Sequence, residues 1–352
     1  MEQMFSLLTQ LNSMKNIVIL IVFALVTAGL FNACNKEEIT KPDPNDPYGV
    51  YNPTPFDLLL PGRFPKMIIP DNNPLTVEGV ELGKMLYYDP IVHKDSAQAC
   101  ASCHIQELSF SDSSLCMAHV NLGWTRNFLW DGKVTGTLED VMLFEVDDFF
   151  MADINRLNNS ATYKKKFHEA FGVKTITSTE AAKALAQFLR TVVSGNSKFD
   201  KYVNNTISLS DSEMRGYEIF DSERGDCFHC HDIVLFTDGD FHNNALDTVF
   251  TRKGLSDISG NPLDNGKFRT PTLRNIELTA PYMHDGRYNT LEEVVEFYST
   301  GQHYSSTIDP LMYRAAQGGI NFTAQEKQDL VAFLKTLTDD DFITNPAFSS
   351  PF

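Results

Sequence analysis

The sequence predicts an all-α protein made of two domains that resemble each other. Two observations favour helices: apolar residues recur at helical spacing from Thr76 onward, and no stretch shows the sustained alternation of a strand. A third observation indicates two domains, because the pattern Cys-x-x-Cys-His occurs twice, at residues 100–104 and 227–231. At 352 residues the chain is long enough for two domains that each bury a core.

The beginning of the chain, residues 1–34, predicts a lipoprotein-type signal peptide. A lysine follows Met14, which is an alternative start, and an apolar run covers residues 17–30. The run has the length of a signal-peptide core and is short for a membrane span. Cys34 would then be lipidated, which predicts a bacterial periplasmic protein anchored to the outer membrane, with exposure at the cell surface as an option. Plain secretion is the alternative.

The rest of the chain divides into three stretches. Prolines recur throughout residues 35–72, which predicts an extended tether. The first domain is expected over residues 73–205 and the second over residues 206–345, with residues 194–205 as the linker between them. Capping boxes that predict helix starts are found at Thr177 with Glu180, Ser210 with Glu213, Thr290 with Glu293, and Thr323 with Glu326.

The repeated Cys-x-x-Cys-His pattern is typical of covalently attached c-type haem. Each thiol adds to one vinyl group of the porphyrin, and the two intervening residues let one helical turn reach both. The histidine that follows is then held under the iron as a ligand. A zinc half-site or a redox dithiol also uses Cys-x-x-Cys, but the second copy favours haem. The sequence therefore predicts two haem c groups, attached through Cys100, Cys103, Cys227 and Cys230, with His104 and His231 on the irons.

A weak internal repeat distinguishes the two predicted haem sites. Residues 128–141 match residues 282–294, and each copy lies downstream of its own haem motif. Leu129 in the first copy stands where Met283 stands in the second. A thioether can ligate haem iron and raise its potential, whereas an isobutyl group cannot ligate. We therefore expect Met283 to occupy the sixth coordination position of the C-terminal iron. The N-terminal iron should be open to a small oxidant such as peroxide. Core packing is the alternative role for Met283.

Charge and cysteine usage limit the class of partner. The formal net charge of −17 argues against nucleic acid, whose phosphates would be repelled. An acidic surface suits a small basic electron-donor protein, although it also serves solubility. Six cysteines are present and the haem motifs use four of them, so a disulfide framework is not expected. Contact with a membrane is expected only through the lipid anchor.

From Thr76 to Asp340 the chain resembles the bacterial di-haem cytochrome c peroxidase family, which includes the MauG-like enzymes. The longest matching stretch is residues 280–287, APYMHDGR. The other matching stretches, besides the haem motifs, are residues 110–112, 121–122, 130–132, 199–200, 236–238, 241–243 and 271–275.

The resemblance implies two cytochrome c-like domains whose haems have different functions. The N-terminal haem would reduce hydrogen peroxide to water, and the C-terminal haem, ligated by His231 and Met283, would accept electrons from a periplasmic cytochrome c or copper protein. Trp130 falls on the family's tryptophan between the haems, a relay for electrons. Met283 favours the peroxidases, because the MauG-like tryptophan-modifying enzyme has tyrosine there. A homodimer is a further option.

The chain departs from the family in the loop before Asn121. Only eight residues, 113–120, fill a loop that is longer in the family and that bears a histidine capping the peroxidatic iron in some members. His119 is the sole candidate substitute ligand, although it stands at a packing position. The shorter loop also removes an asparagine that helps bind calcium between the domains, which puts calcium in doubt.

The second departure concerns the acid/base. The family's distal glutamate falls on Phe150, and phenylalanine can neither take nor give a proton. Glu145 is a candidate substitute, with Asp147 and Asp148 beside it. The predicted function is therefore a cytochrome-c peroxidase type of oxidoreductase. The alternatives are a di-haem electron-transfer protein without efficient peroxidase activity, and MauG-like oxidation of a protein or organic substrate.

Overall fold

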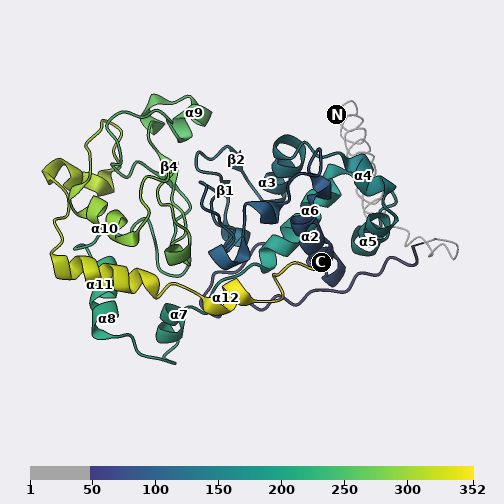
Figure 1. Cartoon of the computed structure of the whole chain (residues 1–352), viewed down its shortest axis with the longest axis horizontal. Helices are drawn as coiled ribbons and strands as arrows, with labels where there is room; N and C mark the ends of the chain where they lie inside the picture. The colour runs from purple at the N-terminus through teal and green to yellow at the C-terminus, as the bar shows by residue number, and fades with distance from the viewer. Residues whose placement is uncertain (1–47) are drawn as a thin grey trace, which may run out of the picture. The chain divides into compact units, whose positions relative to one another are not determined.

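The computed structural model of the chain describes residues 48–352 (Figure 1). Its contacts divide the chain into Met1–Val50 and Tyr51–Phe352, and the second unit contains all of the helices and strands in the described residues. The predicted signal peptide, Cys34 and the start of the predicted tether lie outside the described residues. Within residues 48–352, no helix is both long enough and apolar enough to span a bilayer.

The described unit is rich in helices and has only short strands, in agreement with the expected fold class. The α-helices are α2 Val77–Tyr88, α3 Leu138–Phe144, α4 Ile154–Asn159, α5 Ala161–Phe171, α6 Ser178–Thr191, α7 Lys198–Val203, α8 Asp211–Phe220, α9 Leu255–Ser259, α10 Leu291–Thr300, α11 Ala324–Lys335 and α12 Asp340–Thr344. The 3-10 turns are η1 Pro90–Val92, η2 Cys100–Ser102, η3 Gln106–Leu108, η4 Leu122–Trp124, η6 Pro262–Asp264, η7 Ile276–Leu278 and η8 Pro310–Gln317, and η5 Glu145–Phe149 is a π-helix. Two antiparallel pairs of strands join β1 Asn127–Phe128 to β2 Val134–Thr135, and β3 Phe241–His242 to β4 Phe268–Arg269.

The same arrangement of helices occurs twice. Helix α2 packs on α6 in the N-terminal half, and α8 packs on α11 in the C-terminal half. Each crossing depends on a glycine, because a Cβ on Gly83 would overlap the carbonyl oxygen of Ala184 and a Cβ on Gly216 would overlap that of Asp329. The backbones can therefore approach closely only where the sequence has no side chain. In each half, a helix that precedes the Cys-x-x-Cys-His motif therefore packs closely on a later helix.

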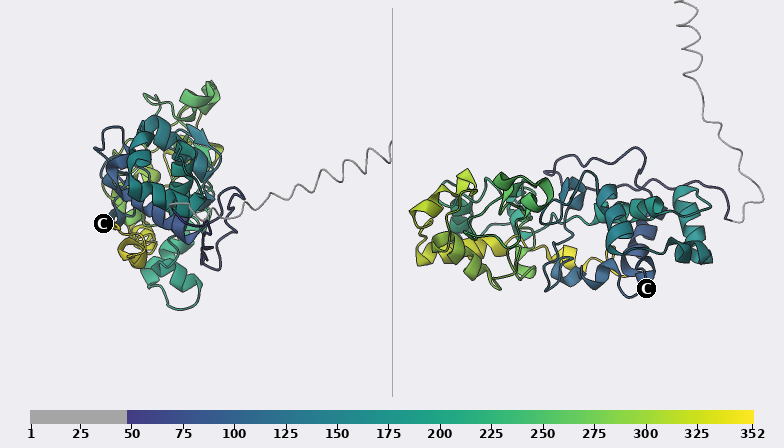
Figure 2. Two further views of the ribbon diagram at one scale, coloured as in Figure 1. Left: turned by 90° about the vertical axis from the view of Figure 1, so that its right-hand side faces the viewer. Right: turned by 90° about the horizontal axis from the view of Figure 1, so that it is seen from above.

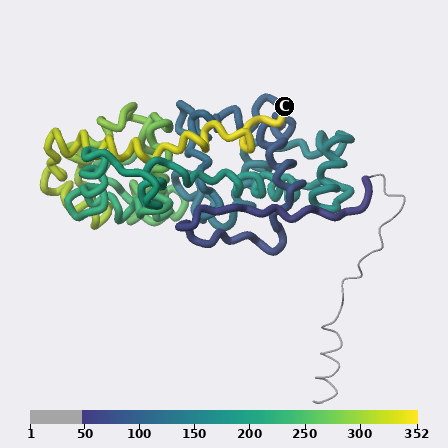
Figure 3. The backbone as a smooth tube through the Cα atoms, turned by 90° about the horizontal axis from the view of Figure 1, so that it is seen from below, coloured from purple at the N-terminus to yellow at the C-terminus, as the bar shows by residue number. Residues whose placement is uncertain are grey.

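Two hydrophobic clusters lie in separate parts of the unit, one among the blue and teal helices and one among the green and yellow helices (Figures 1 and 2). The first cluster includes Leu82, Phe188 and, from the end of the chain, Phe342 and Phe348. Figure 3 shows the yellow C-terminal segment running from the green half back across the blue half. The last residues of the chain therefore complete the core of the N-terminal half.

The stretch before α2 is extended, as its prolines predict, but residues 54–67 do not form a free tether. Pro55 bridges to Thr76 as in a β-ladder. The indole Nε1 of Trp124 donates to the carbonyl oxygen of Pro65 at 2.8 Å, and Met67 is only 4% exposed. Figure 3 shows this purple segment lying along the unit. The prediction of a tether up to residue 72 is wrong for these residues, because apolar side chains between the prolines find partners in the fold.

The predicted linker, residues 194–205, contains a helix and is fixed at its start. Helix α7 begins at Lys198 behind a capping box formed by Ser197. Before it, the carboxylate of Asp339 accepts hydrogen bonds from the Ser194 hydroxyl at 3.1 Å and from two successive backbone amides at 3.0 and 2.9 Å. Three donors on one carboxylate oxygen hold the start of the linker in a single conformation.

A buried ion pair joins α7 to the loop before η7. The guanidinium of Arg274 is 1% exposed and donates to both carboxylate oxygens of Asp200, at 2.8 and 3.0 Å, and to the carbonyl oxygen of Val234. Burial alone would raise the pKa of Asp200, but hydrogen bonds and charge from Arg274 outweigh burial and hold this pKa below its usual value. Asp200 is therefore ionised at neutral pH.

Replacing Asp200 by asparagine should lower the free energy of unfolding by about 3–5 kcal/mol, because it leaves the buried guanidinium without its countercharge. The measurement is chemical denaturation of the purified protein. Asp341→Asn is the matched control, since that carboxylate is 73% exposed and lies 4.0 Å from Lys201. We expect the control to cost about 0–1 kcal/mol. Equal losses in the two variants would contradict a structural role for the buried pair.

Candidate functional site

The histidine that ends each Cys-x-x-Cys-His motif is oriented by a backbone carbonyl. His104 Nδ1 lies 2.9 Å from the carbonyl oxygen of Phe110, and His231 Nδ1 lies 3.1 Å from that of Phe236. Because a carbonyl only accepts, each Nδ1 carries the proton and each Nε2 keeps a free lone pair. Phe110 and Phe236 share a left-handed backbone, with φ of 56° and 54°, which turns their carbonyl oxygens toward the rings.

The imidazoles of both motifs are held neutral. Burial lowers the pKa of His104 to about 4, and burial also lowers the pKa of His231. A neutral ring with a free Nε2 is the form that binds a metal. The hydrogen bond on Nδ1 fixes the orientation of the ring, as is usual around metal-binding histidines.

All four motif cysteines are half-buried, and burial favours the thiol form of three of them, Cys100, Cys227 and Cys230. Burial raises the pKa of Cys227 and of Cys230 to about 12, and burial also raises that of Cys100. In each motif a backbone hydrogen bond from the histidine to the first cysteine closes one helical turn, at 3.0 Å in both copies. This turn presents the two thiols and the imidazole together.

A cavity of about 210 Å³ lies beside the C-terminal motif and has a mainly apolar lining. Cys227, Cys230 and His231 line it, and so does Met283. The Met283 thioether accepts a weak hydrogen bond from the side-chain amide of Asn244, with 3.7 Å between nitrogen and sulfur. Two thiols, an imidazole and a thioether around one apolar cavity are a donor set that fits haem c. The residues present therefore fit the group that the motif predicts.

The first copy of the repeat has the backbone of the second but a different side chain. Leu129 and Met283 both have a left-handed φ, 63° and 72°, and each is followed by a glycine of like conformation, Gly132 and Gly286, at 72° and 70°. The two positions therefore match in structure as well as in sequence. Leucine carries no ligand atom, so this position offers none in the N-terminal half.

His119 lies against the ligand histidine of the N-terminal motif. Its ring is stacked on that of His104, with 3.4 Å between centroids and 15° between planes, and its Nδ1 lies 3.1 Å from the hydroxyl of Tyr87. These two contacts, with His104 and Tyr87, agree with a packing position for His119.

Glu145 differs from the two aspartates that follow it. It opens η5 and is half-buried, whereas Asp147 and Asp148 are exposed. Burial raises the pKa of Glu145 to about 7, although the charge of Lys133 acts in the opposite direction. After burial, the charge of Glu145 is the next contribution that raises the pKa of the Cys100 thiol, so the carboxyl group lies near the N-terminal motif. Glu145 can therefore give or take a proton there at neutral pH.

Phe150, at the position of the family's acid/base, is part of the packing. Its side chain is 4% exposed, and its ring meets that of His93 edge to face, with 5.7 Å between centroids. It offers no proton-transfer group. Phe150 therefore cannot itself serve as an acid or base.

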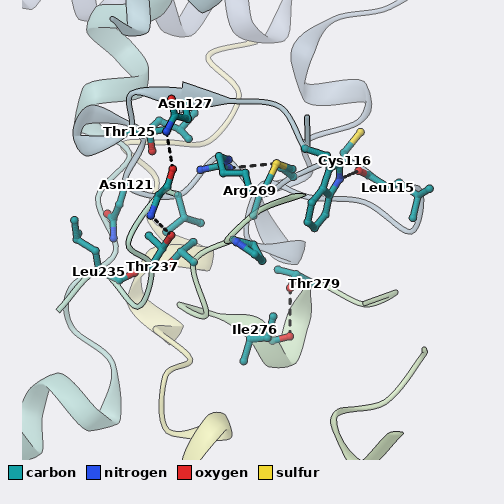
Figure 4. A pocket seen from close by; sticks show the side chains of 18 of the residues that line it. Leu115, Cys116, Asn121, Thr125, Asn127, Leu235, Thr237, Arg269, Ile276 and Thr279 are labelled. Atoms are coloured by element: carbon teal, nitrogen blue, oxygen red, sulfur yellow. Dashed lines mark hydrogen bonds between the residues drawn. The ribbon is translucent and has the colours of Figure 1, made fainter. Parts of the chain in front are cut away.

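Trp130 lies between two cavities. One is the cavity beside the C-terminal motif, and the other has a volume of about 270 Å³ and is shown from close by in Figure 4. The indole Nε1 of Trp130 donates to the carbonyl oxygen of Leu115 at 2.9 Å, and the carbonyl oxygen of Trp130 accepts from the backbone amide of Arg269 at 2.9 Å. Both ends of this residue are therefore held in place.

Comparison with known proteins identifies the family. A family profile described as di-haem cytochrome c peroxidase matches residues 77–208. Methylamine utilization protein MauG of Methylophilus methylotrophus is 30% identical over 289 residues, covering 76% of this chain and 84% of that protein. The chain belongs to the di-haem cytochrome c peroxidase and MauG family. The family predicted from the sequence is confirmed, and this membership supports haem c cofactors. Calcium remains an untested prediction.

Relatives within this family carry both names. A cytochrome-c peroxidase of Pseudomonas sp. (strain SCT) is 29% identical over 327 residues, covering 78% of this chain and 84% of that protein. A crystal structure of a MauG-like protein associated with microbial copper homeostasis is 34% identical, with a TM-score of 0.78, and the match covers 84% of this chain and 99% of that one. Family membership therefore leaves open whether the chain acts as a peroxidase or in a MauG-like role.

Sequence reasoning missed the carbonyl groups that orient the two histidines, although a signal was present. Phe110 and Phe236 begin the similar stretches Phe-Ser-Asp and Phe-Thr-Asp, six and five residues after the histidine of each motif. In both copies, the phenylalanine that begins this stretch supplies the carbonyl oxygen that accepts from the histidine. Arg269 was also missed, because nothing local in the sequence shows that it is buried.

Proposed function

We propose that the chain reduces hydrogen peroxide with electrons from a small donor protein. The observation that carries this proposal is Glu145, a half-buried carboxyl group with a pKa near 7 beside the N-terminal haem motif. Haem bound to Cys100, Cys103 and His104 would supply the iron that binds peroxide and the electrons that reduce it. In the C-terminal half, Cys227, Cys230, His231 and Met283 would hold the haem that receives electrons.

The protein's own contribution to peroxide cleavage is proton transfer. The Glu145 carboxylate takes a proton from the near oxygen of peroxide and returns it to the leaving oxygen, so that water departs instead of hydroxide. A pKa of about 7 keeps both forms of the group populated at neutral pH. Meanwhile the carbonyl oxygen of Phe110 keeps His104 in one tautomer and one orientation. Leu129 offers no ligand that would compete with peroxide.

The pH profile of peroxide turnover tests this proposal. The carboxylate is the active form of the base, so kcat/KM for peroxide should rise about tenfold per pH unit below pH 7 and level off above it. The measurement is peroxide-dependent oxidation of a reduced small cytochrome c between pH 5 and 9. A profile that is flat across this range would contradict a base with a pKa near 7.

A second candidate function is the oxidation of a protein substrate. It is favoured by the relatives named MauG and by the MauG-like crystal structure at 34% identity. Methionine at residue 283, where the MauG-like tryptophan-modifying enzyme has tyrosine, favours the peroxidase. The two functions differ in the molecule that is oxidised when peroxide is reduced. A peroxidase needs a continuous supply of reduced donor, whereas a MauG-like enzyme changes the mass of a partner protein.

We propose a periplasmic location with a lipid anchor at Cys34, for which the apolar run ending near that residue is the support. Cys34→Ser should move the protein from the membrane fraction to the soluble periplasm, because it removes the sulfur atom that would carry the lipid. The measurement is fractionation followed by immunoblotting. Cys116→Ser is the control, and it should leave the distribution unchanged. A Cys34→Ser protein that stays in the membrane fraction would contradict the anchor.

A further inference from the structure

Arg269 is a buried arginine without an anionic partner. Three arginines in the described residues are less than 9% exposed, namely Arg190, Arg269 and Arg274. Arg190 pairs with Glu139 through two hydrogen bonds, and Arg274 pairs with Asp200. Arg269, at 7% exposure, forms no ion pair with any carboxylate of residues 48–352. It is therefore the exception among the buried guanidinium groups.

The contacts of the Arg269 side chain do not compensate its charge. One terminal nitrogen lies 3.2 Å from the sulfur of Met117, which is a weak acceptor, and the buried Nε has no hydrogen-bond partner. Burial lowers the pKa of Arg269 to about 10, so the group stays charged at neutral pH. A buried charge without a partner is costly, and a planar guanidinium matches a carboxylate through two parallel hydrogen bonds. The site is therefore built for an anion.

The backbone around Arg269 fixes where the guanidinium points. Arg269 ends β4, which pairs with β3, and its backbone amide donates to the carbonyl oxygen of Trp130 at 2.9 Å. Its neighbour Phe268 is stacked on His284, with 3.5 Å between ring centroids. Figure 4 shows the Arg269 side chain within the larger cavity, with the dashed line to the sulfur atom. An anion bound here would lie next to Trp130.

We propose that Arg269 binds a propionate carboxylate of the C-terminal haem. Arg269 lines both cavities, but only the one beside the C-terminal motif is also lined by the attachment cysteines, Cys227 and Cys230. A haem attached there would bring its propionate carboxylates into a cavity that Arg269 also lines. A small anion entering the other cavity from solvent shares the same chemistry and is the competing source. The inference rests on haem attachment, not on the peroxide chemistry of the proposed function.

The test compares three variants of the haem-loaded protein. Arg269→Gln removes the charge. Arg269→Lys keeps the charge but cannot form two parallel hydrogen bonds to a carboxylate. Arg126→Gln is the matched control, because Arg126 lines the neighbouring cavity but is exposed, so that solvent screens its charge. Covalent haem content is checked first on a denaturing gel. The midpoint potential of the C-terminal haem is then measured by spectroelectrochemistry, and its propionate bending bands by resonance Raman spectroscopy.

Loss of a buried positive charge disfavours the reduced haem. We expect Arg269→Gln to lower the equilibrium constant for reduction about tenfold, which is about 59 mV for one electron, with both haems still attached. Arg269→Lys should change this equilibrium constant by less than about threefold, and it should shift the propionate bands. Arg126→Gln should change neither quantity.

Two results would overturn the proposal. One is an unchanged potential and unchanged propionate bands in Arg269→Gln or, should that variant not fold, unchanged bands in Arg269→Lys. The other is a response of the wild-type spectrum to added acetate or phosphate that is absent in Arg269→Lys, because this would assign the site to a free anion. Loss of peroxidase activity is not a readout here, so failure of the proposed function leaves this test intact.

Discussion

Replacing Glu145 by glutamine lowers peroxide turnover about 10²–10⁴-fold at pH 7, the usual effect of losing a general acid/base. Glutamine keeps the size of the side chain and a hydrogen-bonding oxygen, but it cannot take a proton from peroxide. The loss should fall on kcat/KM for peroxide and leave electron transfer from the donor to the C-terminal haem unchanged. Stopped-flow mixing of the reduced protein with peroxide measures the first step, and mixing with reduced donor measures the second.

Asp147→Asn is the matched control for this prediction. It makes the same chemical change two residues away, on a carboxylate that is exposed to solvent. We expect it to keep turnover within about threefold of wild type, since a solvent-exposed carboxylate contributes little to proton transfer at a buried site. If instead Asp147→Asn is slow and Glu145→Gln is normal, the acid/base has been assigned to the wrong side chain of η5.

Replacing Met283 by leucine removes the methionine-to-iron charge-transfer band of the C-terminal haem and lowers its midpoint potential by on the order of 10² mV. Axial ligands span roughly 0.8 V of haem potential, and methionine lies at the high end because its sulfur favours ferrous iron. Leucine has nearly the same volume, so packing should change little. The measurements are near-infrared absorption of the oxidised protein and a redox titration.

Met312→Leu is the control for the ligand assignment. Met312 lines the same cavity as Met283, so the variant makes the same chemical change on a second thioether of the pocket. The charge-transfer band and the potential should both survive in Met312→Leu. If the band disappears in Met312→Leu and persists in Met283→Leu, Met312 and not Met283 is the ligand of the C-terminal haem.

Local sequence patterns predicted local structure well. The four capping boxes that begin at Thr177, Ser210, Thr290 and Thr323 all form in the structure, each by hydrogen bonds within one turn. The internal repeat likewise predicted positions with matching backbone, since a left-handed φ recurs at Leu129 and Met283. These features depend on residues only a few positions apart, which is why a sequence shows them directly.

Features that depend on distant contacts could not be predicted. Phe342 and Phe348 lie more than 200 residues after Leu82 in the chain, yet they share its core. Glu145 is half-buried at the start of the π-helix η5, whereas Asp147 and Asp148 of the same element are exposed, and no local sequence pattern marks this difference. Arg269 illustrates the same limit, because burial of its charge is set by elements from both halves of the unit.

The measurement that tests the central proposal most directly is the absorbance of the half-reduced protein during addition of one equivalent of peroxide. In this state the C-terminal haem is reduced and the N-terminal haem is oxidised, so the two sites can be followed separately. If the chain reduces peroxide, the C-terminal haem should be re-oxidised within the first turnover, and added reduced donor should restore it repeatedly. Slow bleaching of both haems, with the C-terminal haem still reduced, would contradict the proposal and favour a di-haem electron-transfer protein.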